Sequence, residues 1–124
     1  MKRYIKSIYP NIYMNRVKYD PLDIRRKIGN ICVAHSFFIL FALKSNSNPL
    51  SIPEIAREIS RLTEGRITLQ DQQTRGPTQA LARRGLLREI PTRYGSRRIM
   101  KYAITPLGLR YLKALEIFLE ALGL

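Results

Sequence analysis

Proline follows a short polar residue by one or two positions at several points in the sequence, and three of these points constrain where helices can begin. They are Asp20-Pro21, Ser51-Ile52-Pro53-Glu54 and Thr105-Pro106. A polar side chain of this kind accepts hydrogen bonds from the free amides of a first helical turn, and proline is tolerated within that turn. The sites therefore predict helices over about residues 21–44, 52–63 and 106–122.

The second half of the first predicted helix is an apolar stretch from Ile31 to Leu43. It is shorter than the roughly 20 apolar residues that a membrane span requires, so we expect a buried core helix. The stretch contains Cys32, the single cysteine, which excludes an intramolecular disulfide and suggests a reducing compartment. It also contains His35, the one histidine, which we expect in the core or an interface because a metal site needs three or four ligands.

The middle of the chain predicts two further helices. Apolar residues recur at helical spacing from Ile52 to Leu62, and Gly65 suits the end of that helix. A polar helix is predicted over about 68–84, with Thr68 and Asp71 as its capping pair. Gly76-Pro77 in its middle leaves two alternatives, because proline kinks a helix: the helix bends there, or its regular part begins at Pro77.

Two short strands, Leu87–Pro91 and Ile99–Thr105, are predicted after this helix, joined by a hairpin loop over 92–98. The last helix is apolar over most of its circumference, which predicts burial against its own domain and against a partner subunit. The residues expected at the dimer contact are Leu107, Tyr111, Leu112, Leu115, Phe118, Leu119 and Leu122.

The predicted fold is α+β and mostly helical: a winged helix-turn-helix with a two-stranded wing and a C-terminal dimerisation helix over about 106–122. Residues 1–19, which carry basic and tyrosine side chains, are expected to form an N-terminal arm, and residues 20–124 the domain. The arm has no long apolar stretch and no cleavage site of small residues, so it is not expected to be a signal peptide.

The segment from Ile52 to Leu122 resembles the winged-helix transcription regulators of the MarR and PadR type. The resemblance rests on SIPEIAREI, ALARRGLLREI and RRIMKYAITPLGLRYLKAL, in that order. It implies DNA binding through the helix after the turn, contact of the wing with the flanking DNA, and a homodimer joined by terminal helices. It also implies that a small-molecule effector can act, although no residue indicates a pocket for one. Gly76-Pro77 departs from the family pattern.

The charge of the chain points to a polyanionic partner. Lys and Arg number 22 and Asp and Glu number 9, which gives a net charge of +13. Double-stranded DNA is the partner that we expect first, because neutralised phosphates release counterions, and an anionic membrane surface is the alternative.

Gln, Thr and Arg side chains with base-reading donors and acceptors gather on the third helix, and arginines gather in the predicted hairpin loop. The alternatives are a solvated helix face and an edge-protecting charge cluster. Basic residues of the arm either follow the minor groove or belong to a segment packed on the partner subunit. The predicted DNA-binding residues are Gln70, Gln72, Gln73, Thr74, Arg75, Thr78, Gln79, Arg83, Arg93, Arg97, Arg98, Lys2, Arg3 and Lys6.

The sequence has no second histidine, no carboxylate pair in an apolar setting and no glycine-rich phosphate loop, so we expect no catalysis, cofactor or metal. The first functional hypothesis is a dimeric, sequence-specific transcriptional repressor, cytoplasmic and associated with the nucleoid. One alternative is an architectural, replication or plasmid-partition protein that binds DNA without sequence preference. The other is a winged-helix module that binds protein or RNA.

Overall fold

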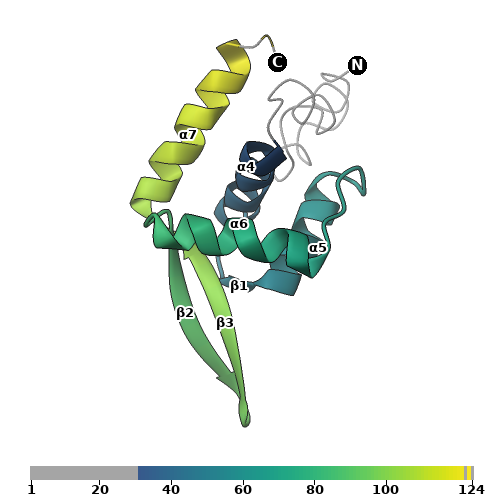
Figure 1. Ribbon diagram of the computed structural model, residues 1–124, viewed down its shortest axis with the longest axis vertical. Coiled ribbons are helices and arrows are strands. Elements are labelled where there is room, and N and C mark those ends of the chain that lie inside the picture. The colour runs from purple at the N-terminus through teal and green to yellow at the C-terminus, as the bar shows by residue number, and fades with distance from the viewer. Residues whose placement is uncertain (1–30, 122, 124) are drawn as a thin grey trace.

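The computed structural model describes residues 31–121 and 123 (Figure 1). The arm over 1–19 and the start of the first helix near Pro21 lie outside the described residues. In chain order the elements are α4 (Ile31–Lys44), β1 (Leu50–Ser51), α5 (Ile52–Leu62), α6 (Asp71–Arg83), β2 (Leu87–Tyr94), β3 (Arg97–Ile104) and α7 (Pro106–Ala121).

Helix α4 is the centre of the core. Every side chain from Phe37 to Leu43 is buried, and α4 contacts α5, α6, α7 and β3. The ring of Phe37 packs edge-on against Phe38 and stacks on Phe41. A helix that is apolar on all sides must be covered on all sides, and the other elements supply that cover. The expected core helix is thus confirmed for the described side chains, which do not include that of Cys32.

Helix α5 begins and ends as its sequence predicts. The Ser51 N–H donates to Glu54 Oε1 over 2.8 Å, and the Glu54 N–H donates to Ser51 Oγ over 3.4 Å, which completes a capping box. At the other end the Thr63 hydroxyl donates to the Ile59 carbonyl over 2.8 Å. Gly65 then turns the chain away with a φ of +80°.

Helix α6 begins three residues later than predicted, at Asp71, and Thr68 is not its cap. Ile67 and Leu69 are buried in the core on either side of Thr68, and this burial holds the chain in a connecting segment before the helix can start. Gln70 takes the capping position, where its N–H donates to Gln73 Oε1 over 2.9 Å.

The helix continues through Gly76-Pro77, so the alternative in which its regular part begins at Pro77 is wrong. Proline disfavours helical backbone in the residue before it, partly through a clash with that residue's Cβ. Gly76 has no Cβ, which removes this part of the clash.

The hairpin is longer than predicted. Strands β2 and β3 pair from Leu87↔Ile104 to Tyr94↔Arg97, and only Gly95-Ser96 remain as the turn. The expected loop over 92–98 is therefore wrong. Gly95 has a φ of +62°, and a two-residue turn with positive φ matches the twist of the strands, so pairing extends to the turn.

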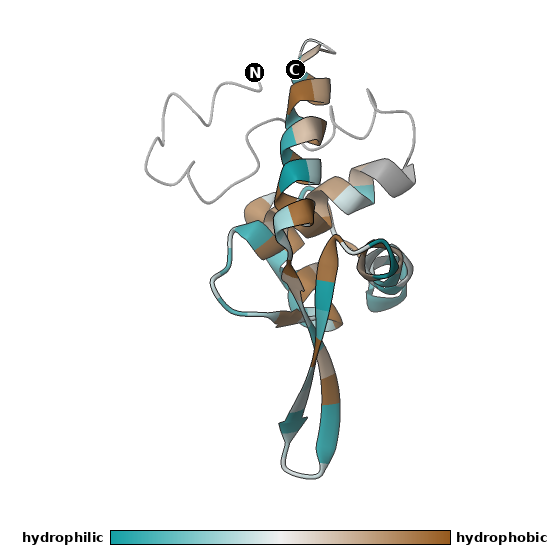
Figure 2. Ribbon diagram, turned by 90° about the vertical axis from the view of Figure 1, so that its left-hand side faces the viewer, coloured by the Kyte–Doolittle hydropathy of each residue, from teal (hydrophilic) through white to brown (hydrophobic). Residues whose placement is uncertain are grey.

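Strand β1, which was not predicted, pairs with β3 and gives the sheet the order β1-β3-β2. The β2–β3 hairpin, called the wing from here on, projects away from the helices, whereas α7 extends in the opposite direction (Figure 1). Hydrophilic residues flank the turn at the far end of the wing (Figure 2). The sheet thus holds the wing at its base and leaves its far end open to a partner.

Helix α7 starts at Pro106, as predicted, and is held close to the base of the wing. The Gly108 N–H donates to Thr105 Oγ1 over 3.0 Å, and the Thr105 hydroxyl lies 2.7 Å from the Gly85 carbonyl oxygen and 3.0 Å from that of Leu86. Gly108 is buried, and a Cβ built there would lie 2.2 Å from the Leu86 carbonyl oxygen. A residue without a side chain is therefore required where α7 crosses this backbone.

The substitution Gly108→Ala tests this crossing. Because the added methyl would overlap a backbone oxygen rather than a flexible side chain, we expect a loss of about 2 to 3 kcal/mol in the free energy of unfolding, measured by urea denaturation. The exposed control Lys113→Ala should stay within about 0.5 kcal/mol of the wild type. An equally small effect of both substitutions would contradict the close approach.

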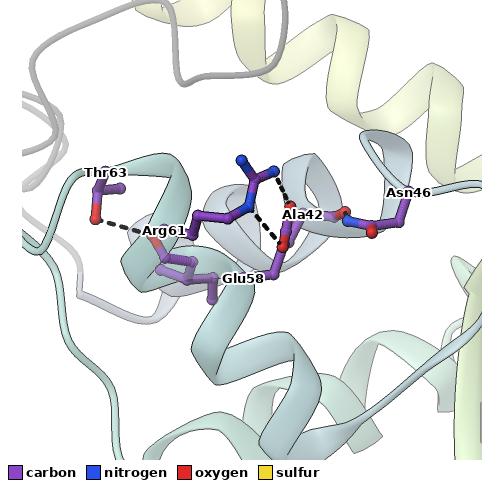
Figure 3. Close-up of polar contacts among 6 residues, drawn as sticks. Ala42, Asn46, Glu58, Arg61 and Thr63 are labelled. Carbon is purple, nitrogen blue, oxygen red and sulfur yellow. Dashed lines mark hydrogen bonds and ion pairs between the residues drawn. The ribbon is translucent and has the colours of Figure 1, made fainter.

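An ion pair and a side-chain cap stabilise the region where α4 leads toward α5 (Figure 3). Arg61 pairs with Glu58 one turn away, and Asn46 Nδ2 donates to the Ala42 carbonyl over 2.9 Å. The hydrogen bond from Arg61 is the main cause that lowers the pKa of Glu58, partial burial opposes it, and Asn46 adds a smaller lowering effect. The Glu58 side chain is 15% exposed and that of Arg61 58%.

This lowered pKa makes the stability contribution of Glu58 dependent on pH. The contribution is complete above the ordinary pKa of glutamate and is lost as the pH falls through the lowered value. Glu58→Gln should cost about 0.5 kcal/mol in unfolding free energy near neutral pH, and this difference should shrink at about pH 3. Urea denaturation at the two pH values measures it, and a difference that does not change with pH would refute the assignment.

Candidate nucleic-acid interface

Helices α5 and α6 form a helix-turn-helix in which α6 crosses in front of α4 (Figure 1). The inner face of α6 carries Thr74, Thr78 and Leu81, all buried. The prediction that Thr74 and Thr78 bind DNA is therefore wrong, because both are fully enclosed. They lie four residues apart, with Leu81 three residues further on, and this spacing places all three on one side of the helix.

Thr74 and Thr78 instead let α6 pack against its neighbours. The Thr74 hydroxyl donates to the Gln70 carbonyl over 3.0 Å, which satisfies its hydrogen-bonding group inside the helix. Small side chains on this face allow the contacts that α6 makes with both α4 and α5.

The outer face of α6 holds the remaining predicted residues of this helix. Gln79 is half-buried, and the exposed ones are Gln70, Gln72, Gln73, Arg75 and Arg83. Their amide and guanidinium groups supply the donors and acceptors that match base edges in the major groove.

The predicted wing arginines are exposed, but they lie on paired strands rather than in a loop. Arg93 lies directly opposite Arg98, and Arg97 lies opposite Tyr94. Like charges directly across a strand pair lower stability. An anion bound at the end of the wing would relieve this repulsion.

A groove of about 360 Å³ separates α6 from the wing. Sequence reasoning missed most of its lining, including Glu89, Tyr102 and the start of α5. Alternation along β3 could have placed Tyr102 on the inner face, but it could not show that α6 lies opposite. The lining residues are Ser51, Ile52, Pro53, Arg75, Gln79, Glu89, Arg97, Arg98, Ile99, Met100 and Tyr102.

The groove is positively charged. Among residues 31–121 and 123, no ion pair engages the guanidinium groups of Arg75, Arg97 or Arg98. Burial raises the pKa of the Tyr102 phenol, with a further rise from the nearby Glu89 carboxylate and an opposing effect from Arg75. Glu89 is the one acid among the described residues that line this groove, so the surroundings favour an anion.

Lys101 is a basic residue of the wing whose side chain interacts with other residues of the same chain. Its Nζ donates to Tyr94 Oη over 2.8 Å and lies 3.7 Å from Glu54 Oε1. The hydrogen bond with Tyr94 and the Glu54 charge raise the pKa of Lys101. Lys101 therefore links the wing to the start of α5, whereas the three arginines stay available.

The predicted dimer contacts on α7 fall into two groups. Leu112 and Leu119 are buried in the core of their own chain, so the prediction that they contact a partner subunit is corrected. The apolar residues of α7 extend around so much of the helix that the sequence could not show which side faces its own core. Tyr111 and Leu115 are half-buried against that core.

The α7 stripe, defined here as Leu107, Tyr111 and Phe118, lies on one flank of the helix. Leu107 and Phe118 are 44% and 46% exposed, which is high for side chains of this size. Leu109 and Ile117 are also exposed, although neither was among the predicted dimer contacts. Leu122, like Lys2, Arg3 and Lys6 of the arm, lies outside the described residues.

In the described part of the chain, no three His, Cys, Asp or Glu side chains come together in a way that could hold a metal ion. None of the described helices combines the length and the apolar character that crossing a membrane requires.

Comparison with solved structures identifies the fold. A PadR-like transcription factor from Bacteroides fragilis superimposes with a TM-score of 0.65 at 18% identity, covering 80% of this chain and 92% of that one. The chain has a winged-helix fold. BpsR of Bordetella bronchiseptica, whose DNA binding is regulated by 6-hydroxynicotinic acid, matches with a TM-score of 0.50 at 21% identity, over 73% of this chain and 56% of BpsR.

The winged-helix architecture expected from the sequence is thus confirmed. No protein-family model and no curated protein sequence matches the chain.

Proposed function

We propose that this winged helix is a DNA-binding transcriptional regulator that binds duplex DNA with α6 in the major groove and with the wing on the flanking backbone. The observation that carries the proposal is the groove between α6 and the wing, where Arg75, Arg97 and Arg98 face outward without ion pairs in the described part of the chain.

Binding to DNA phosphates would offset the electrostatic cost of this positively charged groove. A net charge of +13 repels itself in the folded chain, and a DNA backbone neutralises it with release of counterions. The glutamines and arginines on the outer face of α6 then supply contacts to base edges, which phosphate contacts alone cannot make specific.

The solved neighbours support the same class of function. One is a PadR-like transcription factor, and the other, BpsR, is a DNA-binding protein under small-molecule control. By analogy we assign this chain DNA binding in a regulatory role, in the cytoplasm and on the nucleoid. Repression would follow where the protein occupies a promoter, and no effector is assigned.

Replacing arginines of the groove tests the proposal. Arg75→Ala and Arg98→Ala should each weaken binding to duplex DNA about 5-fold to 50-fold, because each removes a charge-assisted contact. Fluorescence anisotropy against a salt series measures the affinity, and the salt dependence should become shallower by about one counterion per variant if the arginine contacts phosphate.

Arg110→Ala is the matched control. It removes the same charge from an exposed position on α7, a helix that contributes no residue to the groove lining. We expect its affinity to stay within about 2-fold of the wild type, since distant charges are screened at physiological salt. Equal losses for all three variants would mean that only net charge matters, which favours the architectural alternative over a defined interface.

We also propose that two copies associate through the α7 stripe. Leu107 and Phe118 expose apolar surface on one flank of a helix whose core side is already filled by Leu112 and Leu119. Burying such side chains against a second copy removes them from water. A two-fold dimer would then present two α6 helices to half-sites about one turn of DNA apart.

The substitution Phe118→Glu should dissociate this dimer, because it places a charge in an apolar contact. Sedimentation or light scattering should show a change from two chains to one. Leu109→Glu is the matched control, since Leu109 is 43% exposed and lies nine residues away, on the opposite flank of α7. Dissociation by the control alone, or a wild type that is already monomeric, would refute the stripe as the interface.

A further inference from the structure

We propose that Gly76 is the point at which α6 comes closest to DNA, and that its bare backbone accommodates the 5-methyl group of a thymine in the recognised site. This inference rests on the proposed DNA-binding function and adds one specificity-determining residue to it. The supporting observation is the position of Gly76 on the outer face of α6, where no neighbouring atom of the described residues requires a glycine.

The helix geometry places Gly76 opposite the buried face. It lies two residues after Thr74 and two before Thr78, and each such step turns the helix by about 200°. Gly76 is exposed, with Gln72 one turn before it and Gln79 about one turn after it on the same side. Long polar side chains therefore flank a spot without any side chain.

No steric contact in the described part of the chain requires a glycine at this spot. A Cβ built on Gly76 meets no atom of residues 31–121 or 123 within 4 Å, whereas one built on Gly108 would meet the Leu86 carbonyl oxygen at 2.2 Å. Gly65, Gly85 and Gly95 have positive φ, and Gly76 does not. An exposed glycine in a helix is less stable than alanine by about 0.5 to 1 kcal/mol, so packing against neighbouring residues gives no reason to keep it.

Pro77 offers one explanation within the chain, since a residue without Cβ eases the backbone before a proline. That explanation concerns the shape of the free helix, whereas our proposal concerns a steric contact with DNA. The two explanations predict different DNA binding when Gly76 and Pro77 are both replaced by alanine.

The major groove supplies a partner that fits a bare helix backbone. It is about as wide as an α-helix with its side chains, so the residue at the centre of the outer face limits how deeply the helix enters. The exposed Cα of glycine has only hydrogens to present, and the one apolar group on base edges in this groove is the thymine methyl. Gln72 and Gln79 would then contact the bases on either side.

The test removes the methyl group from the DNA and, separately, adds one to the protein. The site is first selected with the wild-type protein, and each thymine is then replaced by deoxyuridine, which lacks the methyl. One replacement should weaken wild-type binding about 4-fold, as expected for one buried methyl, while the other thymines serve as controls. Gly76→Ala should bind the thymine site at least about 10-fold more weakly than the wild type. It should recover most of this loss on the deoxyuridine site.

The double variant Gly76→Ala, Pro77→Ala separates steric contact from helix shape, and circular dichroism checks that each variant folds. If the proposal is right, the double variant still discriminates against the thymine site and recovers on deoxyuridine. Full recovery of thymine-site binding by the double variant would overturn the proposal in favour of backbone strain. Unchanged binding by Gly76→Ala, or no deoxyuridine effect, would also overturn it.

These outcomes are distinct from a failure of the proposed function. If the chain does not bind DNA at all, the wild-type protein would bind neither the selected pool nor random duplex DNA. No site would then be obtained in which thymine could be replaced by deoxyuridine.

Discussion

The burial of α4 on all sides is the constraint on which the rest of the structure depends. Its side chains from Phe37 to Leu43 are withdrawn from water, and α5, α6, α7 and β3 all contact it. Each covering element has to turn its apolar side inward, so its polar side must face out. For α6 this leaves glutamines and arginines outside, next to a wing anchored through β1 and β3.

The proposed interface follows from that arrangement. The buried Thr74 and Thr78 hold α6 close to the core, and their placement turns Gln72, Gly76 and Gln79 toward solvent. The groove beside α6 then gathers arginines from two elements that are far apart in the sequence. Self-repulsion among these charges disfavours the isolated chain and favours a polyanionic partner.

Local chemistry explains which parts of the fold were predictable. The helix starts at Ile52 and Pro106 follow from short-range capping, which neighbouring residues determine. Two of the errors arose where tertiary packing decides the structure: burial of Ile67 and Leu69 delays α6, and the core takes up Thr74 and Thr78.

The candidate interface was predictable where composition indicates it and not where the fold assembles it. The basic and amide residues of α6 were found because their composition is unusual, but the groove was not, since only the fold brings Tyr102 and Glu89 opposite Arg75. Likewise, the sequence of α7 could not separate the side that faces its own core from the exposed stripe.

The most direct test of the account is the affinity of the wild-type protein for duplex DNA over a range of salt concentrations, with a pool selected by the protein compared against random fragments. The account predicts a steep fall in affinity with salt and a selected site, arranged as two related half-sites, that outcompetes random DNA. Absence of binding even at low salt would contradict it and would turn attention to protein or RNA partners.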